Sequence, residues 1–133
     1  MNLLVKNIGC IAGIDESGRL RVAGKEMDKV ATLENAWLLT DGERIKDYGT
    51  MESVPCGCGC EVIDAEGQFV GPGFVDIHSH AGNAVRFEVD PATAAKGHLA
   101  QGTTSVLATL GYRLKTPEYV ECIGKIRQVM EQP

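Results

Sequence analysis

The sequence predicts a mixed fold, with a small β-sandwich in residues 1–72 followed by two βα units in residues 73–133. Two observations lead to this prediction. Residues 1–72 contain short apolar runs separated by turns, which is typical of a β-sandwich. After Pro72-Gly73 the pattern changes to strand, helix, strand, helix, which indicates parallel strands joined by helices.

The strands of the first region are bounded by turn clusters. Residues 15–18 read Asp-Glu-Ser-Gly, and Glu66-Gly67 separates two later runs that we expect to pair with each other. Asp41-Gly42 is a strong hairpin signal, because Gly adopts positive φ without a steric penalty. In chain order, the expected strands are residues 3–5, 8–14, 20–23, 36–40, 44–48, 61–65 and 68–70.

The second region alternates buried-type strands with capped helices. Residues 74–77 and 103–110 have the apolar, β-branched character of buried parallel strands. Asp90-Pro91 is a helix start with Asp as the N-cap, and this helix is expected to stop at Gly102. Thr116-Pro117 opens a second helix by the same logic, and its apolar residues recur at helical spacing.

Composition and charge exclude several classes of function. Hydrophobic residues make up 44% of the 133 residues and charged residues 23%, as in an ordinary globular protein with a small core. The net charge is −5 and the basic residues do not cluster, which argues against nucleic acid as a main partner. No apolar run reaches the ~20 residues of a membrane span, and the N-terminus lacks a signal-peptide pattern. We therefore expect a cytoplasmic protein with no membrane partner and with reduced cysteines.

Three cysteines, Cys56, Cys58 and Cys60, alternate with glycine. Three thiols on such a loop can hold a soft metal ion. Their spacing is not one that structural zinc sites use, and a closed site needs a fourth ligand. A flexible turn between strands is therefore the favoured interpretation. His98 lies in the middle of the first expected helix, and we interpret it as a surface or interface residue without a catalytic role.

The segment with the clearest chemistry ends in His78 and His80. Residues i and i+2 of a strand point to the same side, so both imidazoles project from the strand's C-terminal end. Active sites of parallel βα folds form at that end. Two neutral imidazoles at this spacing can chelate one Zn²⁺, Fe²⁺ or similar ion. The alternative is a pair of exposed loop histidines, and the preceding apolar strand favours the ligand interpretation.

Residues 71–80 read Gly-Pro-Gly-Phe-Val-Asp-Ile-His-Ser-His and resemble the first-strand signature of the amidohydrolase superfamily. Residues 61–67 and 41–45 are also similar to that superfamily. The resemblance implies a (β/α)8, TIM-type barrel with an N-terminal β-sandwich part, and one or two Zn or Fe ions that support hydrolysis of a non-peptide carbon–nitrogen bond in a small molecule. Two βα units are too few to close such a barrel, so we expect an incomplete chain that is inactive on its own.

Two groups within the superfamily are similar to different parts of the chain. Residues 24–27 and 34–39 resemble the N-terminal region of imidazolonepropionases, which open the imidazolone ring. Residues 102–110 resemble the second barrel strand of N-acetylglucosamine-6-phosphate deacetylases. Imidazolonepropionases carry an Arg after the His pair that contacts a substrate carboxylate. Arg86 is the nearest candidate for this substrate-binding role, although its spacing from His80 differs slightly.

The resemblance places the main catalytic groups outside these residues. The general acid or base is usually an Asp on the last barrel strand, expected beyond Pro133, and further ligands come from later strands. Asp76 lies two residues before His78. It is interpreted either as an acceptor that orients a ligand imidazole or as a buried polar residue bonded to backbone.

A non-enzymatic interpretation also stays open. The β-rich region with its βα appendage would then act as a binding or assembly module, and the His pair would be incidental. The unpaired parallel edge of the second strand favours association, so a homo-oligomer is compatible with the sequence. Metal binding that His78→Ala abolishes would favour the enzyme interpretation.

Overall fold

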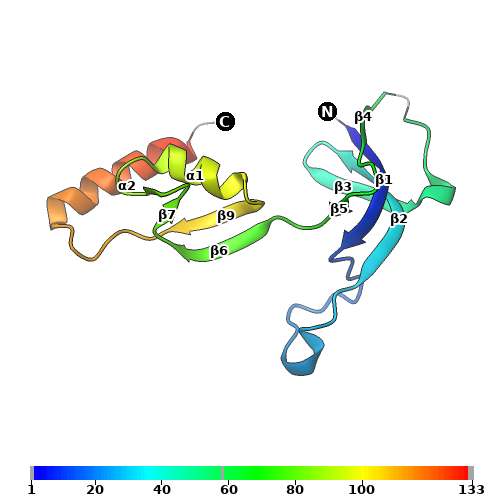
Figure 1. Cartoon of the computed structure of the whole chain (residues 1–133), viewed down its shortest axis with the longest axis horizontal. Coiled ribbons are helices and arrows are strands. Elements are labelled where there is room, and N and C mark those ends of the chain that lie inside the picture. The colour runs from blue at the N-terminus through cyan, green and yellow to red at the C-terminus, as the bar shows by residue number, and fades with distance from the viewer. Residues whose placement is uncertain (1, 58, 132–133) are drawn as a thin grey trace. The chain divides into compact units, whose positions relative to one another are not determined.

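The computed structural model describes residues 2–57 and 59–131 of the chain (Figure 1). These residues divide into two compact units, Met1–Pro72 and Gly73–Pro133. We call them the N-terminal unit and the C-terminal unit and describe each by itself. Among the described residues, no helix combines the length and apolar character that a membrane crossing needs.

The N-terminal unit is built on one mixed sheet. Strand β1 lies inside it, antiparallel to β2 on one side and parallel to the short strands β4 and β5 on the other. Strand β3 pairs with β2 in the hairpin that Asp41-Gly42 predicts, and Gly42 has a φ of 59°. The strands are β1 (Leu3–Ala12), β2 (Thr32–Asp41), β3 (Arg44–Thr50), β4 (Glu61–Asp64) and β5 (Phe69–Val70).

The described strands of this unit form a single five-stranded sheet, whereas the expected sandwich has two facing sheets. The difference arises at β4 and β5, which were expected to pair with each other. Instead, β4 joins β1 at Leu3 and β5 joins it further along at Cys10, so both extend the first sheet. The two strands expected at residues 3–5 and 8–14 are one strand, because the chain passes Asn7 in a local irregularity with a φ of 53°.

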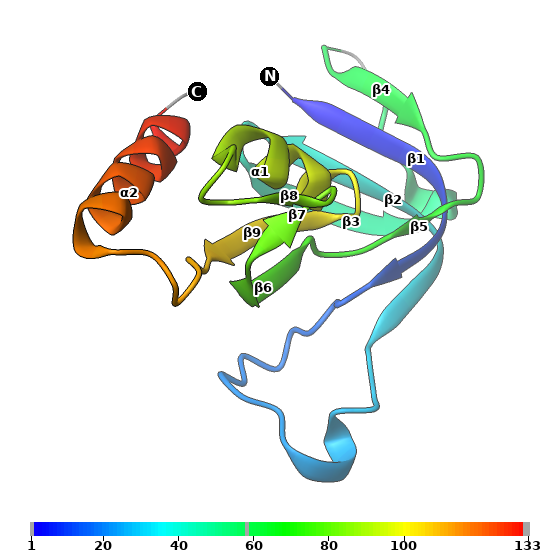
Figure 2. The ribbon, with the colours of Figure 1, turned by 60° about the vertical axis from the view of Figure 1, so that its left-hand side comes forward.

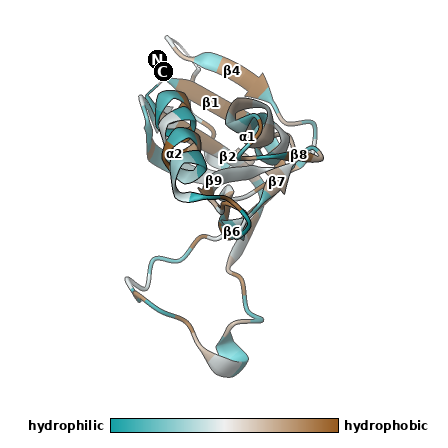
Figure 3. Cartoon of the chain, turned by 90° about the vertical axis from the view of Figure 1, so that its left-hand side faces the viewer, coloured by the Kyte–Doolittle hydropathy of each residue, from teal (hydrophilic) through white to brown (hydrophobic). Residues whose placement is uncertain are grey.

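The core of this unit is centred on Ile8, Ile11 and Ala36, which are 0%, 5% and 0% exposed. Removing an isoleucine side chain from water contributes about 1.5–3 kcal/mol. Gly9 lets the chain before β5 approach β1, since a Cβ there would lie 2.1 Å from the carbonyl oxygen of Gly67. Figure 3 shows the apolar character of β1 along its length.

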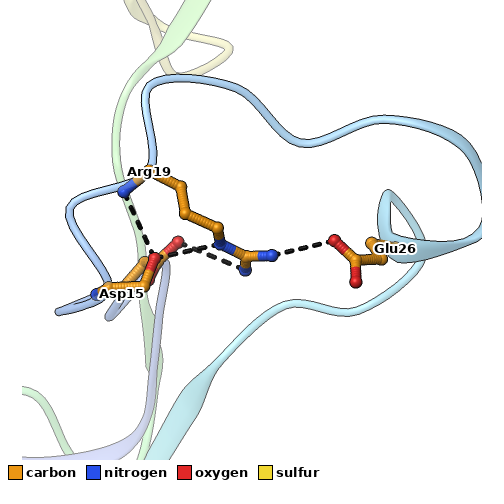
Figure 4. Close-up of polar contacts among 4 residues, drawn as sticks. Asp15, Arg19 and Glu26 are labelled. Carbon is orange, nitrogen blue, oxygen red and sulfur yellow. Dashed lines mark hydrogen bonds and ion pairs between the residues drawn. The ribbon is translucent and has the colours of Figure 1, made fainter.

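Residues 13–31 connect β1 to β2 and extend beyond the ends of both strands (Figure 2). The strand expected at residues 20–23 does not form. Leu20 is fully exposed, Ala23 is exposed and Val22 is half-buried, so burial of this segment contributes little. The loop is held instead by Arg19, whose guanidinium lies 3.7 Å from Asp15 and 2.8 Å from Glu26 (Figure 4). Hydrogen bonds from the Ser17 side chain and backbone, with help from Arg19, lower the pKa of Asp15.

The C-terminal unit contains the two parallel strands and two helices that the sequence predicts. Strands β6 and β9 pair in parallel, and a small antiparallel hairpin of β7 and β8, which the sequence analysis did not anticipate, precedes the first helix. The elements are β6 (Phe74–Ser79), β7 (Ala81–Gly82), β8 (Val85–Arg86), α1 (Pro91–Leu99), β9 (Thr103–Ala108) and α2 (Thr116–Met130).

The caps of the two helices differ. Asp90 caps α1 as predicted, accepting a hydrogen bond from the Thr93 N–H at 3.1 Å. The N-cap of α2 is Lys115, one residue earlier than predicted. The reason is Glu118, whose carboxylate accepts the Lys115 N–H at 2.6 Å and so satisfies the donor that precedes the helix. Figure 3 shows α2 with polar and apolar residues intermixed along its surface.

The buried hydrophobic residues of this unit lie outside the parallel β6–β9 pair. Phe87, Ala94 and Cys122 are 2%, 0% and 6% exposed, and they belong to the segment after β8 and to the two helices. By contrast, large apolar side chains on the two paired strands remain accessible. These are Phe74, Val75, Ile77 and Leu107, with exposures between 64% and 75%.

Candidate functional site

The His pair lies at the C-terminal end of the parallel strands. His78 is the second-last residue of β6, and His80 follows directly after the strand. The pairing with the neighbouring strand continues to this point, since Ser79 is in register with Ala108 and its carbonyl accepts the Thr109 N–H at 2.8 Å. The backbone of the His pair is therefore fixed on one side by β9.

The structure brings the two imidazoles of His78 and His80 together. Their ring centroids are 5.1 Å apart and their planes meet at 81°. The Nδ1 atom of His80 is buried and has no hydrogen-bond partner in the described part of the chain. A buried imidazole nitrogen without a partner fits coordination of a metal ion, because coordination replaces the missing hydrogen bond.

The ligand set present here is small. Within residues 2–57 and 59–131, no group of three or more His, Cys, Asp or Glu side chains is arranged to hold a metal ion. Catalytic zinc usually has three protein ligands. The two imidazoles therefore fit a divalent ion as part of a ligand set and do not complete one.

Asp76 contacts the backbone of the His segment. Its Oδ1 accepts the His78 N–H at 3.0 Å, and the side chain is half-buried. Of the two interpretations of this residue, the contact observed is the one to backbone. Asp76 shapes the end of β6, and in the part of the chain that the structure describes its carboxylate forms no hydrogen bond to an imidazole ring.

His98 supports the turn that carries the His pair. Its Nε2 lies 3.1 Å from the Ser79 hydroxyl and 3.2 Å from the Ala81 carbonyl oxygen, and its ring stacks on Phe87 with centroids 5.7 Å apart. The sequence suggested a surface or interface role, whereas the side chain is half-buried against this turn. No local sequence pattern predicts this contact, because His98 lies on the following helix and reaches the turn only in the folded unit.

Two glycines bring α1 close to the same turn. A Cβ on Gly82 would lie 2.1 Å from the Ala94 carbonyl oxygen, and one on Gly97 would lie 2.6 Å from the Asn83 nitrogen. Real Cβ atoms do not approach backbone atoms so closely, so only glycine permits this packing. The helix and the turn are thus held at backbone contact distance.

A cavity of about 460 Å³ opens beside His80. Three segments contribute to it: the residue between β6 and β7, β8 with the residues just after it, and the loop that follows β9. Its lining residues are His80, Arg86, Glu88, Gly111, Tyr112, Arg113 and Leu114. Arg86 was a candidate from the sequence, but Glu88, Tyr112 and Arg113 were not. The only sequence signal for the last two is their place after the second parallel strand.

Arg86 and Glu88 form an ion pair in this cavity. The Arg86 Nε donates to Glu88 Oε1 at 2.5 Å, and the Glu88 side chain is only 14% exposed. Gly111 packs against the pair, since a Cβ there would lie 2.8 Å from an Arg86 terminal nitrogen. The charge of Arg86 is therefore largely balanced within the protein.

The cysteine run lies in the N-terminal unit, before β4. Cys56 and Cys60 belong to this connection, where the Cys60 N–H donates to the Gly57 carbonyl at 3.1 Å. Cys58 lies outside the described residues. The turn expected here is consistent with this hydrogen bond.

Comparison with curated proteins identifies relatives of part of the chain. The chain is 42% identical over 86 residues to an imidazolonepropionase of Christiangramia forsetii. This alignment covers 62% of the chain and 21% of that protein. The chain is 34% identical over 93 residues to an imidazolonepropionase of Flavobacterium johnsoniae, and 30% identical over 103 residues to a dihydroorotase of Staphylococcus epidermidis. Each of these two alignments covers 23% of the relative, and they cover 68% and 75% of this chain, respectively. The chain thus spans less than a quarter of these relatives. No family model matches it.

Solved structures share the fold of the whole chain. N-acetylglucosamine-6-phosphate deacetylase from Pasteurella multocida matches with a TM-score of 0.68 at 20% identity, over 100% of this chain and 31% of that one. Guanine deaminase from E. coli matches with a TM-score of 0.62 at 20% identity, over 96% of this chain and 33% of that one. A mixed, sheet-rich fold with few helices is therefore shared with these proteins.

Proposed function

We propose that the chain belongs to the amidohydrolase superfamily and that it contributes the first metal ligands to a hydrolase of a non-peptide carbon–nitrogen bond. The observation that carries this proposal is the pair of imidazoles 5.1 Å apart at the C-terminal end of parallel strands. Both the imidazolonepropionase relatives and the deacetylase and deaminase structures bear names of enzymes that act on such bonds.

We propose that β6, α1, β9 and α2 are the first two units of a (β/α)8 barrel and that the N-terminal unit is the β-rich part that accompanies it. The parallel pairing of β6 with β9 supports this arrangement. So does the exposure of apolar side chains such as Val75 and Ile77, because the strands of a barrel are covered on both faces.

His78 and His80 are the proposed ligands of a divalent ion, zinc or iron. Such an ion supplies Lewis-acid polarisation of a carbonyl and a bound water that is acidic enough to react near neutral pH. The chain's own residues fix the rings: the Asp76 carboxylate holds the His78 backbone, and the Ser79–His98 contact holds the turn between them. The substrate is a small molecule with an amide-like bond.

Hydrolysis needs more than these two ligands. Since the described residues supply no third ligand, the remaining ligands and the acid or base come from other residues. We therefore expect the 133-residue chain alone to bind metal weakly and to show no turnover.

Metal binding tests the proposal, and the cysteine run must be separated from the histidines. The chain with Cys56, Cys58 and Cys60 replaced by Ser is titrated with Co²⁺ and Zn²⁺, monitored by the visible spectrum of Co²⁺ and by calorimetry. Binding should persist in this background. Either His78→Ala or His80→Ala should weaken it at least about tenfold, a change of about 1.4 kcal/mol.

Two results would contradict the proposal. Binding that disappears in the Ser background, with thiolate-to-Co²⁺ absorption in the natural chain, would assign the metal to the cysteines. A chain that binds no metal but forms a defined oligomer would favour the binding or assembly module. The Lys96→Ala variant on α1 is the control for nonspecific loss, because Lys96 is exposed and outside the His segment.

A further inference from the structure

The cavity beside His80 contains two arginines in different electrostatic states. Arg86 is paired with Glu88 at 2.5 Å. Arg113 forms no ion pair with any residue that the structure describes. Its Nε donates to the Tyr112 hydroxyl at 3.2 Å, and its guanidinium carbon lies 5.5 Å from the centre of the Tyr112 ring.

The charges lining the cavity leave one cation unbalanced. The charges of Arg86 and Glu88 cancel, and Arg113 is the remaining Lys, Arg, Asp or Glu side chain among the lining residues. Arg113 therefore gives the cavity a net positive charge. A cavity wall with one sign of charge concentrates ions of the other sign.

The geometry of Arg113 leaves its anion-binding edge available. A guanidinium has five N–H donors in a planar fork. The bond from Nε to Tyr112 uses the donor nearest the chain, so the two terminal nitrogens keep their parallel donors. Such a pair binds a carboxylate or a phosphate through two hydrogen bonds at once. The Tyr112 contact also orients the side chain before a ligand arrives.

We propose that Arg113 is the residue that recognises an anionic group, a carboxylate or a phosphate, on the substrate processed at the His pair. Arg86, the candidate from the sequence, instead holds Glu88 and the packing against Gly111. The inference rests on the proposed function, because His80 belongs both to the proposed metal site and to this cavity. It assigns the selectivity for a charged substrate to the loop after β9.

Anion binding can be measured on the metal-free 133-residue chain. Sodium propionate and inorganic phosphate are titrated separately at constant ionic strength, and binding is monitored by NMR at the Arg113 Nε–H and at the amides of residues 111–114. We expect saturable shifts with one or both anions. The anion that binds more tightly identifies the group as carboxylate or phosphate.

Three variants separate Arg113 from its neighbours. Arg113→Gln should weaken binding at least about tenfold, because a charge-assisted bidentate contact is lost, and Arg113→Lys should restore part of it. Arg127→Gln removes the same charge from α2, away from the cavity lining, and should bind like the natural chain. The double variant Arg86→Gln/Glu88→Gln removes the ion pair without changing the net charge and should retain binding. An amide spectrum of each variant verifies its fold.

The proposal is overturned if neither anion gives saturable shifts, or if Arg113→Gln binds as tightly as the natural chain. It is also overturned if the double variant loses binding while Arg113→Gln keeps it, since the pair would then be the recognition element. Failure here is distinguishable from failure of the proposed function. If only the anion-recognition proposal fails, metal binding that depends on His78 persists. If the proposed function fails, that metal binding is absent whether or not anions bind.

Discussion

The two units bury their apolar residues in different ways. In the N-terminal unit, β1 has strand neighbours on both edges and Ile8 on it is fully buried. In the C-terminal unit, β6 has one strand neighbour and Ile77 on it is 75% exposed. Its buried side chains belong instead to the helices and the segment after β8. The first unit makes its core from its own sheet, while the unit that carries the His pair leaves large apolar side chains of its parallel strands exposed.

This difference links exposure to function. Parallel strands are normally covered on both faces, so the exposed apolar side chains of β6 and β9 support the proposed barrel, in which further residues would cover them. The same unit lacks a third metal ligand among its described residues. The proposed barrel would account for both observations, because its further residues would cover the exposed strand side chains and supply the remaining metal ligands.

The largest expected effect contrasts the two isoleucines. Ile8→Ala should destabilise the N-terminal unit by about 2–5 kcal/mol, because it leaves a cavity in a packed core. Ile77→Ala should change the stability of the C-terminal unit by less than about 0.5 kcal/mol. Urea unfolding monitored by Trp37, the single tryptophan and 4% exposed, reports on the first unit.

Hydrogen exchange of the C-terminal unit provides the measurement for Ile77→Ala. A cost for this variant as large as that for Ile8→Ala would mean that the exposed face of β6 is covered in solution, for example by a second copy. Repeating the experiment over a range of protein concentrations would then separate self-association from a folded-state contact within the chain.

How far the sequence could predict the fold depends on the range of the interactions. Strands and helices with local signals, such as the Asp41-Gly42 hairpin and the Asp90 cap, were predicted because turn and cap chemistry acts over a few residues. The sequence did not predict which strands pair with each other in the N-terminal unit. The pairing of both β4 and β5 with β1 brings together residues about half the chain apart, and no local pattern encodes it.

The residues of the candidate site also differ in whether a local sequence pattern predicts them. His78 and His80 could be singled out because their spacing on a strand determines that the rings approach each other. The cavity residues Glu88 and Arg113 could not, because they meet only through the folded loops. The ion pair between Arg86 and Glu88 is likewise a contact of the folded segments, and spacing alone does not encode it.

An intermediate effect separates two mid-helix glycines of the C-terminal unit. Gly97→Ala should destabilise it by about 1–3 kcal/mol, because the new Cβ meets backbone atoms that cannot move without displacing α1. Gly124→Ala on α2 meets nothing within 4 Å. It should stabilise the helix by roughly 0.5–1 kcal/mol, the usual gain of Ala over Gly.

Urea unfolding monitored by helical circular dichroism measures both glycine variants, since the described α-helices belong to this unit. Equal and favourable effects at the two positions would mean that α1 is not packed against the β7–β8 hairpin as the structure shows. Metal titration of the same variants adds a functional readout. Gly97→Ala should also weaken metal binding, because α1 holds the turn of the His pair, whereas Gly124→Ala should leave it unchanged.

The smallest effect is the acid sensitivity of the α1 cap. Hydrogen bonds from the Thr93 hydroxyl and N–H lower the pKa of Asp90 below its ordinary value of 3.8. Because the folded state binds this proton less tightly than the unfolded state, the cap stabilises α1 fully above the unfolded pKa. Its contribution is lost as pH falls through the lowered folded value.

The NMR shift of the Thr93 amide should therefore stay constant from neutral pH to about pH 5 and change below about pH 4. Asp90→Asn keeps an acceptor for the helix N-terminus but cannot titrate, so it should flatten this transition while preserving α1. The same acid transition in the Asn variant would assign it to another carboxylate. A flat profile in the natural chain would mean that the Thr93 contacts are absent in solution. In either case α1 would owe its place beside the His turn to the His98 contacts and to the packing at Gly82 and Gly97, and the two glycine variants become the decisive measurement of that packing.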